Sequence, residues 1–381
     1  MRVAIIGSSR DIHVRRWGQA LAQAGAEVLY VGIEPDPEES LPYFCIGPPV
    51  TRPRLLDFLR RRRALREFLE EKKVEVAHPI YLTPAGIWVW SSGFRPYVVF
   101  TMGADVLEYG PAPPPLHRCW TLQGRVPTLI DYGTVLLRRW LLPSLLYPTL
   151  RQSLLILGDN YELCLSNKFF VKEKKYIELP TGIESMAEGA AEEGERWILS
   201  PRGATLLYQA DIILAGYYQY LQRGGRYPLA LLAGPYPIHP TVANYVRLIE
   251  SHFPNMIYFF IKKIPKDEMT QVWARTVAFI SAPVYDGYSY AVAEGRLVGA
   301  LPIVNAIPAH LEVLTHGYNA WFVEPFTPEG LCEALFVVES LLKGPPFWRQ
   351  PNAEWIQRFS ALDRNAQLFL TLLDQALKAK K

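Results

Sequence analysis

The segment that decides the fold is 284–304, which reads VYDGYSYAVAEGRLVGALPIV. A strand-like apolar run, 276–283, precedes this segment, and a second one, 301–306, begins within it. Between these runs, a turn rich in Gly, Tyr and Ser leads into an apolar helix that we expect over 289–298 and that Gly299 ends. Asp286 lies before this helix and Glu294 lies within it. The order strand, turn, helix, strand predicts a parallel sheet covered by helices.

The same alternation runs along the whole chain. Strands are expected at 2–7, 26–32, 74–80, 97–103, 153–159 and 175–180, and again at 196–203, 228–234, 255–261, 276–283, 301–306 and 320–325. Helical patterns separate most of them. The small and acidic stretch 185–195 has no apolar periodicity and is expected to be a linker. We therefore predict an α/β protein with two doubly wound, Rossmann-like domains, 1–184 and 196–350, followed by a C-terminal helix over 351–381 that packs back toward the first domain.

Length and composition limit the function. A chain of 381 residues is long enough for two domains, and its net charge of +3 gives no support for a nucleic-acid partner. The apolar run at the N-terminus is too short for a signal peptide, and no uninterrupted apolar window is long enough to span a bilayer. These features predict a cytoplasmic protein that is at most peripheral on the inner face of the membrane.

The acids and the turn of 284–304 favour a particular ligand. Ligands of doubly wound sheets bind beyond the carboxyl ends of the strands, so we expect the site in a cleft between the two domains. A helix that begins near Ser289 directs unpaired N–H groups there, which suits a phosphate. Asp286 and Glu294 would accept hydrogen bonds from sugar hydroxyls. The alternative from spacing alone is that Asp286 caps the helix and that Glu294 is a surface acid.

Six motifs in order resemble the retaining glycosyltransferases of family 4, which have the GT-B fold. The family's E-x7-E motif and the G-x-P-V-V that follows it are similar to DGYSYAVAEGRLVGALPIV, with Asp286 and Glu294 in the acidic places. The other motifs are HVRRWGQALAQAGAEV from His13, RPYVVFTMGADVL from Arg95, ILSPRGATLLYQADIILAGY from Ile198, KKIPKDEMTQVWARTVAFISAP from Lys262 and HLEVLTHGYNAWFVEPFTPEGLCEAL from His310.

The resemblance implies roles for single residues. Glu294 would bind the ribose of a nucleotide-diphosphate sugar, Asp286 the transferred sugar, and Arg202 the diphosphate; these three are the expected catalytic residues. Gly7, Ser8, Lys263, Ile264, Gly287, Tyr288, Ser289 and Tyr290 would complete the donor site. His13, Met102, Gly103 and Asp105 are candidates on the acceptor side. The family typically needs no metal or other cofactor, and no His, Asp and Glu cluster here has metal-ligand spacing.

The sequence also departs from the family. A Lys usually follows the Arg by five or six places and pairs with the same diphosphate, whereas this chain has Leu207 and Tyr208 there. Arg10 or Lys262 would then have to supply a second positive charge. If the position of Tyr208 faces the phosphates, Tyr208→Lys should tighten diphosphate binding.

Three functions remain open from the sequence. The leading hypothesis is a retaining transferase that moves a sugar to the hydroxyl of a glycan, a lipid-linked or a small-molecule acceptor. The alternatives are a non-catalytic binder of sugar nucleotides or glycans, and a nucleotide-sugar epimerase. The arginines at 60–63 and the RRW at 138–140 are either solvated helix faces or contacts with an anionic membrane or a lipid-phosphate acceptor.

Overall fold

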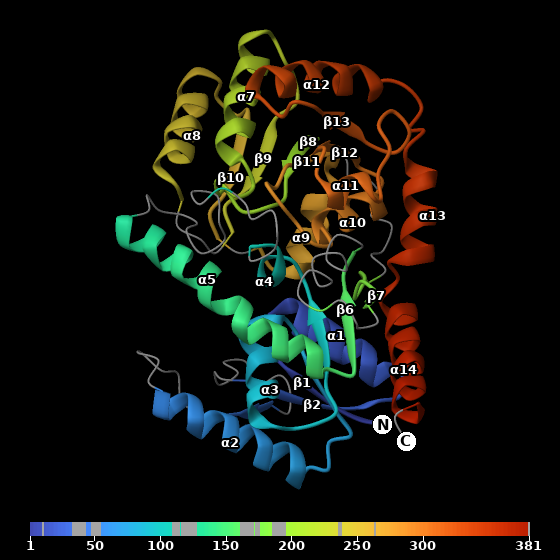
Figure 1. Cartoon of the computed structure of the whole chain (residues 1–381). Coiled ribbons are helices and arrows are strands. Elements are labelled where there is room, and N and C mark those ends of the chain that lie inside the picture. The colour runs from blue at the N-terminus through green and yellow to red at the C-terminus, as the bar shows by residue number, and fades with distance from the viewer. Residues whose placement is uncertain are drawn as a thin grey trace. The chain divides into compact units, whose positions relative to one another are not determined.

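The computed structural model describes residues 1–9, 11–32, 43–46, 55–108, 115, 128–160, 171, 176–184, 196–234, 238–262 and 264–379 (Figure 1). Arg10, Lys263 and the expected linker 185–195 lie outside the described residues. The chain divides into two compact units. Unit 1 comprises Met1–Pro113, Leu137–Glu184 and Ala361–Lys381, and unit 2 comprises Pro114–Leu136 and Ser185–Ser360.

Unit 1 contains two parallel sheets. The first has the order β3 (Tyr43–Cys45), β2 (Glu27–Gly32), β1 (Arg2–Ile6), β4 (Val76–Pro79), and the second has the order β5 (Val98–Thr101), β6 (Leu155–Gly158), β7 (Tyr176–Glu178). Single bridges, Ala77 to Tyr97 and Ile80 to Phe100, join β4 to β5. Strand β1 is buried over its last four residues, as expected for the centre of a sheet with both faces covered.

The helices of unit 1 are α1 (Ile12–Gln23), α2 (Leu55–Glu71), α3 (Ile87–Ser92), α4 (Ala104–Leu107) and α14 (Leu362–Lys378), with a π-helical turn, η1, over Leu82–Gly86. The helix α5 (Leu129–Gln152) is divided between the units at Leu136 and Leu137. The helical segment between β4 and β5 is η1 followed by α3, and Thr83 within η1 has non-helical backbone angles.

The expected helix over 351–381 is two helices, α13 (Arg349–Phe359) in unit 2 and α14 in unit 1. The break occurs because Ser360 leaves the helical conformation and Ala361 is extended and bridges to Ile183. Helix α14 then packs on α1, and Phe369 meets the ring of the buried Trp17 edge-on at 5.6 Å between centroids. The last helix thus completes the core of unit 1.

A buried histidine in this core has a fixed protonation state. Trp17 Nε1 donates to His78 Nε2 at 2.9 Å, and His78 Nδ1 lies 2.9 Å from the carbonyl of Val98. Since the indole can only donate, Nε2 must accept, and the proton of the neutral ring therefore lies on Nδ1. A second proton would have to face the indole N–H, and burial lowers the pKa of His78 to about 4.

This histidine predicts a loss of stability in mild acid. Its folded pKa is below the unfolded one, so its contribution is complete above about pH 6.5 and is lost as pH falls toward about 4. When the pH is lowered from 7 to 5, the free energy of unfolding of His78→Gln should fall by about 2 kcal/mol less than that of the parent protein. Denaturant titrations at the two pH values measure this difference, and parallel losses in both proteins would contradict it.

Unit 2 is built on one parallel sheet. Its order is β10 (Ile257–Phe260), β9 (Leu229–Leu232), β8 (Trp197–Ser200), β11 (Thr276–Ser281), β12 (Leu301–Asn305), β13 (Trp321–Val323). From β8 the chain adds strands outward through β9 to β10, then returns and adds β11 to the other side of β8. Strands β8 and β11 therefore enclose the topological switch point, where the carboxyl ends of such a sheet bind ligands.

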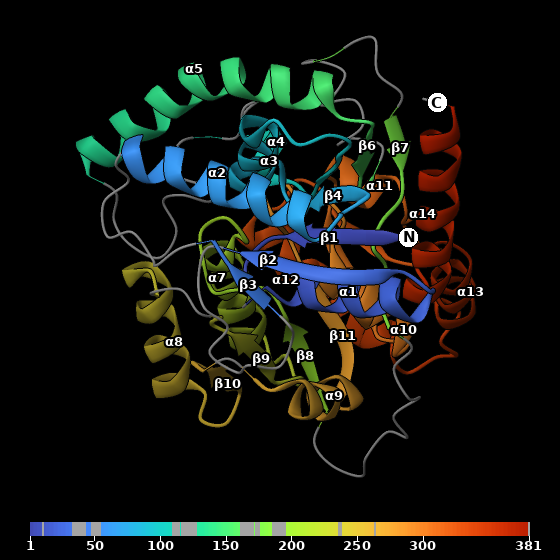
Figure 2. The same ribbon diagram turned by 90° about the horizontal axis from the view of Figure 1, so that it is seen from below.

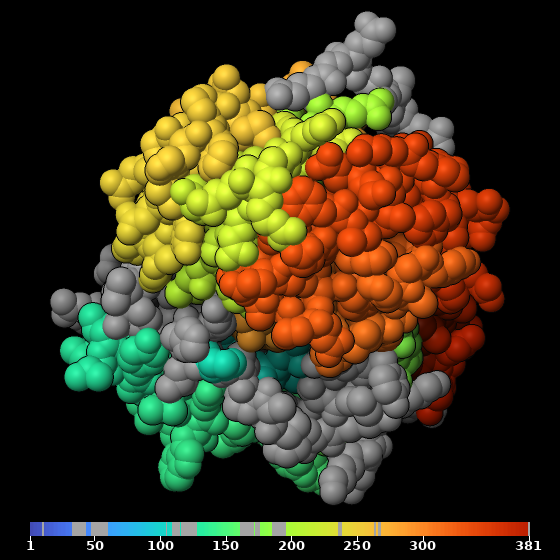
Figure 3. Space-filling view, turned by 90° about the horizontal axis from the view of Figure 1, so that it is seen from above, coloured from blue at the N-terminus to red at the C-terminus, as the bar shows by residue number. Residues whose placement is uncertain are grey.

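Helices cover both faces of this sheet. They are α7 (Ala210–Gln222), α8 (Pro240–His252), α9 (Lys266–Ala274), α10 (Tyr290–Leu297), α11 (Pro308–Leu311), α12 (Pro328–Leu341) and α13. Figure 3 shows α7 and α12 side by side on the outer surface of unit 2. Their close approach requires Gly216, because a Cβ atom there would lie 2.6 Å from the carbonyl oxygen of Pro328. Separate apolar clusters fill the two sides of the sheet.

No helix in the described part of the chain has the length and apolar character needed to cross a membrane.

Candidate functional site

The switch point of unit 2 brings together two residues that the sequence singled out. Arg202 follows β8 by two positions, and Asp286 lies in the turn after β11. Because β8 and β11 are neighbours and parallel, both side chains arise at the same edge of the sheet. Arg202 Nη2 lies 3.2 Å from Asp286 Oδ2, and the two side chains are only 18% and 13% exposed. The two residues form a largely buried ion pair.

Tyr208 contacts the arginine of this ion pair. Arg202 Nη2 donates to the Tyr208 hydroxyl at 3.0 Å, and the guanidinium carbon lies 4.5 Å from the centroid of the ring. Burial raises the pKa of Tyr208, so its phenol is neutral at physiological pH. Of the two positions where the resembling glycosyltransferases carry Lys, Leu207 is buried, and Tyr208 is buried against Arg202. A lysine there would add a second buried cation beside the guanidinium, so we now expect Tyr208→Lys to be harmful.

The start of α10 lies beside the ion pair. Ser289 is the N-cap residue, but its side chain does not cap the helix, and its buried Oγ has no hydrogen-bond partner among the described residues. Gly287 N–H donates to Asp286 Oδ1 at 3.0 Å, which fixes the carboxylate in the turn before the helix. This helix has eight residues, and its N-terminal partial charge lies next to Asp286 and Ser289.

His310 is a site residue that the sequence reasoning did not single out. It lies in the short helix α11 after β12, is 1% exposed, and has Nδ1 2.9 Å from the carbonyl oxygen of Asn305. Nδ1 therefore donates, and Nε2 is left as an acceptor without a partner among the described residues. Burial lowers the pKa of His310 to about 4, and the charges of Asp286 and Arg202 also act on it. A neutral imidazole thus lies close to the ion pair.

Buried polar atoms without protein partners gather at this edge. Within the described residues they include the hydroxyls of Ser281 and Ser289, Oδ1 of Asn305 and Nε2 of His310. Ser281 ends β11 and Asn305 ends β12. Unpaired buried polar groups are uncommon in folded proteins. Their concentration at the carboxyl ends of two neighbouring strands indicates a site suited to a polar ligand.

Most of the other expected donor residues of unit 2 lie on α10 or directly before it. Glu294 is half-buried in the second turn. Tyr288 is buried, with its hydroxyl bonded to Ser360 Oγ, and Tyr290 meets the Tyr288 ring edge-on at 5.0 Å. Tyr288 therefore holds the turn against the end of α13. Ile264, which precedes α9, is partly buried against the apolar cluster on one face of the sheet.

A cavity of about 740 Å³ lies at the opposite edge of the same sheet. Its lining includes Arg196 and Thr276, at the amino ends of β8 and β11, and Gly299 after α10. Because it lies away from the carboxyl ends, this cavity is separate from the candidate site.

In unit 1, the candidate residues near β1 make contacts that shape the backbone of the loop after this strand. A Cβ atom on Gly7 would lie 2.5 Å from Val14 Cγ2, so the close packing of α1 requires glycine there. The carbonyl of Ser8 accepts from Asp11 N–H at 3.1 Å. His13 N–H donates to Asp11 Oδ1 at 2.8 Å, which caps α1. These contacts shape the loop after β1.

The remaining acceptor-side candidates lie after β5. Asp105 is buried and accepts from Leu82 N–H at 2.6 Å and from Met102 N–H at 3.2 Å. Burial raises its pKa to about 6. Gly103 has a φ of 123°, which a side chain would strain. Asp105 thus ties the turn after β4 to the turn after β5.

Within the described residues, no group of three or more His, Cys, Asp and Glu side chains is placed to hold a metal ion.

Comparisons with known proteins agree with this architecture. Residues 2–124 match the family model described as glycosyl transferase 4-like. No curated protein matches the chain. Among solved structures, sucrose-phosphate synthase from Thermosynechococcus elongatus is 15% identical with a TM-score of 0.76, and all of both chains is covered.

Two further structures are similar. A glycosyltransferase from Rickettsia africae has 12% identity and a TM-score of 0.72, with 99% of this chain and 98% of that chain covered. HepE of Anabaena, solved in complex with UDP-glucose, has 11% identity and a TM-score of 0.70, with 98% of this chain and 100% of that chain covered. The predicted fold class is confirmed. The chain therefore has the GT-B fold of glycosyltransferases, and its residues 2–124 match the glycosyl transferase 4-like family.

Proposed function

We propose that this protein is a retaining glycosyltransferase that moves a sugar from a nucleotide-diphosphate donor to an acceptor hydroxyl. The observation that carries the proposal is the Arg202–Asp286 ion pair at the switch point of unit 2, beside the start of α10. A guanidinium, a helix N-terminus and a carboxylate match a ligand that carries phosphates and hydroxyls together. The similar HepE structure, which contains UDP-glucose, supports this choice of donor.

In this proposal each part of the sugar nucleotide is bound by its own protein groups. Arg202 and the first amides of α10 bind the diphosphate, Asp286 binds hydroxyls of the transferred sugar, and Glu294 binds the ribose. Donor binding then requires Arg202 to share its guanidinium between Asp286 and the phosphates. Its planar fork allows this, because it carries five N–H donors in one plane.

The proposed chemistry is electrostatic. As the bond between the sugar's anomeric carbon and the diphosphate oxygen breaks, negative charge builds on the leaving diphosphate. Arg202 and the α10 amides stabilise that charge. The acceptor oxygen forms its bond on the face that the diphosphate leaves, and its proton passes to a donor phosphate oxygen. The step therefore retains configuration and needs neither a protein base nor a metal ion.

The acceptor side is proposed for unit 1, at the loops that His13 and Asp105 organise. We propose that the enzyme acts in the cytoplasm. The nucleotide base, the sugar and the acceptor are best identified by incubating the protein with a panel of labelled sugar nucleotides. Nucleotide release with a glycosylated acceptor supports the transferase. An altered sugar nucleotide would instead identify an epimerase, and tight binding without turnover would identify a binding protein.

Asp286→Asn should weaken recognition of the sugar more than recognition of the nucleotide. The substitution keeps the shape of the side chain but removes the charge that engages sugar hydroxyls and holds Arg202. Binding of the sugar nucleotide should weaken by about tenfold, whereas binding of the free nucleoside diphosphate should change little because Arg202 is released toward the phosphates. Calorimetry with both ligands tests this, with the exposed Asp363→Asn as control. Equal losses for both ligands would exclude this role of Asp286.

A further inference from the structure

The outer face of α5 is unusually apolar. From Leu137 onward, large apolar side chains lie in solvent at 57% exposure for Leu137, 83% for Trp140, 50% for Leu141, 39% for Leu145 and 45% for Tyr147. Their spacing of three and four residues places most of them in one stripe along the helix. The opposite side, with Leu146, Thr149 and Leu150, is buried. The helix is the long green ribbon in Figures 1 and 2.

Positive charge accompanies this apolar stripe. Residues 132–152 contain three arginines, Arg138, Arg139 and Arg151, and no acid. Arg138 is exposed beside Leu137, and Arg151 Nη1 donates to the hydroxyl of Tyr147 at 3.2 Å. Positively charged side chains therefore lie next to the apolar stripe.

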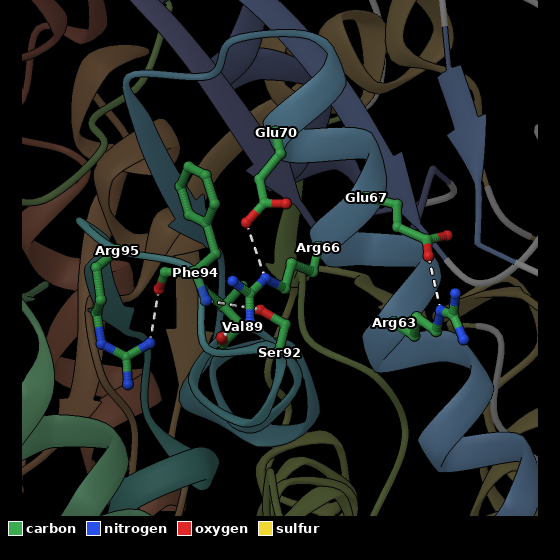
Figure 4. A network of polar contacts seen from close by, with 8 residues as sticks. All are labelled: Arg63, Arg66, Glu67, Glu70, Val89, Ser92, Phe94 and Arg95. Atoms are coloured by element: carbon green, nitrogen blue, oxygen red, sulfur yellow. Dashed lines mark hydrogen bonds and ion pairs between the residues drawn. The ribbon is translucent and has the colours of Figure 1, made fainter.

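The arginines of α2 provide a contrast in the same unit. Figure 4 shows Arg63 paired with Glu67 and Arg66 paired with Glu70, at 2.7 and 2.8 Å, one helical turn apart. Each of these charges is balanced on its own helix, which is typical of a solvated face. On α5 the one acid is Asp131 in the first turn, and no acid lies four residues before or after Arg138 or Arg151 on the helix.

We propose that this face of α5 binds the surface of an anionic phospholipid membrane. A helix with a broad exposed apolar stripe, a tryptophan and neighbouring arginines lies flat at the boundary between headgroups and acyl chains. Trp140, Leu137 and Leu141 enter that boundary, and Arg138 and Arg151 contact lipid phosphates. The arginines and two prolines, Pro143 and Pro148, suit a helix on the surface rather than across the bilayer.

This inference goes beyond the transfer reaction and does not depend on it. It gives the chain a location at a membrane surface, so that an acceptor or product embedded in lipid would be within reach of unit 1. The test accordingly measures membrane binding without any donor or acceptor.

Vesicle sedimentation with the full chain provides the test. Vesicles with roughly 30% phosphatidylglycerol in phosphatidylcholine should bind the protein, and pure phosphatidylcholine vesicles should bind it much more weakly. The double variant Trp140→Ser/Leu141→Ser should bind at least about tenfold more weakly, since burial of these two side chains is lost. Arg138→Gln should weaken binding by about fivefold, and only at low salt.

Leu368→Ser is the matched control, because Leu368 is an apolar side chain on α14 that is 40% exposed. It should bind vesicles like the parent. Equal binding to neutral and anionic vesicles would overturn the role of the arginines. A dimer that Trp140→Ser/Leu141→Ser converts to a monomer would assign the face to a second copy of the chain instead. A lower melting temperature of that variant with unchanged vesicle binding would show that the face packs against protein, which also overturns the proposal.

Discussion

Arg202→Ala should reduce the affinity for a nucleoside diphosphate by about a hundredfold, since a charged hydrogen bond contributes roughly 1.5–3 kcal/mol and the guanidinium can form two with a diphosphate. It should also destabilise unit 2. The substitution leaves the Asp286 carboxylate, whose side chain is 13% exposed, without its cation. Removing one partner of a largely buried pair costs about 3 kcal/mol.

A double variant separates these two effects. Arg202→Ala/Asp286→Ala removes both charges, so it should recover most of the lost melting temperature without recovering diphosphate affinity. Arg202→Lys should keep the charge and the fold but lose the fork-like contacts. Calorimetry and thermal unfolding of the three proteins provide the measurements. If Arg202→Ala bound the diphosphate like the parent, the switch point would not be the phosphate site.

Glu294→Ala should produce the second large effect, a loss of donor binding. Loss of a carboxylate that accepts from ribose hydroxyls should weaken donor binding by one to two decades, because each charged hydrogen bond contributes roughly 1.5–3 kcal/mol. Glu294 is half-buried and is not among the buried residues of α10, so the fold should remain intact. Transfer or donor hydrolysis should fall in step with donor affinity.

The control for Glu294 is Glu250→Ala, an exposed glutamate on α8. This variant should bind and turn over donor like the parent. The sharper comparison uses a ribose and a deoxyribose form of the same nucleotide. The parent should discriminate between them and Glu294→Ala should not. Unchanged discrimination in the variant would remove Glu294 from the ribose site.

Local patterns in the sequence were sufficient for most strands of both units, although β3 (Tyr43–Cys45) was not expected. The apolar run at Arg2–Ile6 and the turn and helix around Ser289 predicted their structures because burial and helix termination depend on neighbouring residues. The break at Ser360 was missed because residues 351–381 are helical in pattern on both sides of it. Only the pairing of Ala361 with Ile183, far away in the sequence, favours an extended residue there.

By itself, then, the sequence determined the alternation of strands and helices, the GT-B class and the candidates Arg202, Asp286 and Glu294. The tertiary structure decided which of them meet. Arg202 and Asp286 are 84 positions apart in the chain, and they pair only because β11 returns to lie beside β8. The same sheet order brings His310 close enough for the charges of both residues to act on it, and it buries Tyr208 against the guanidinium. The physical reason is that strand order is set by long-range packing, whereas residue patterns report only which side of each element is buried.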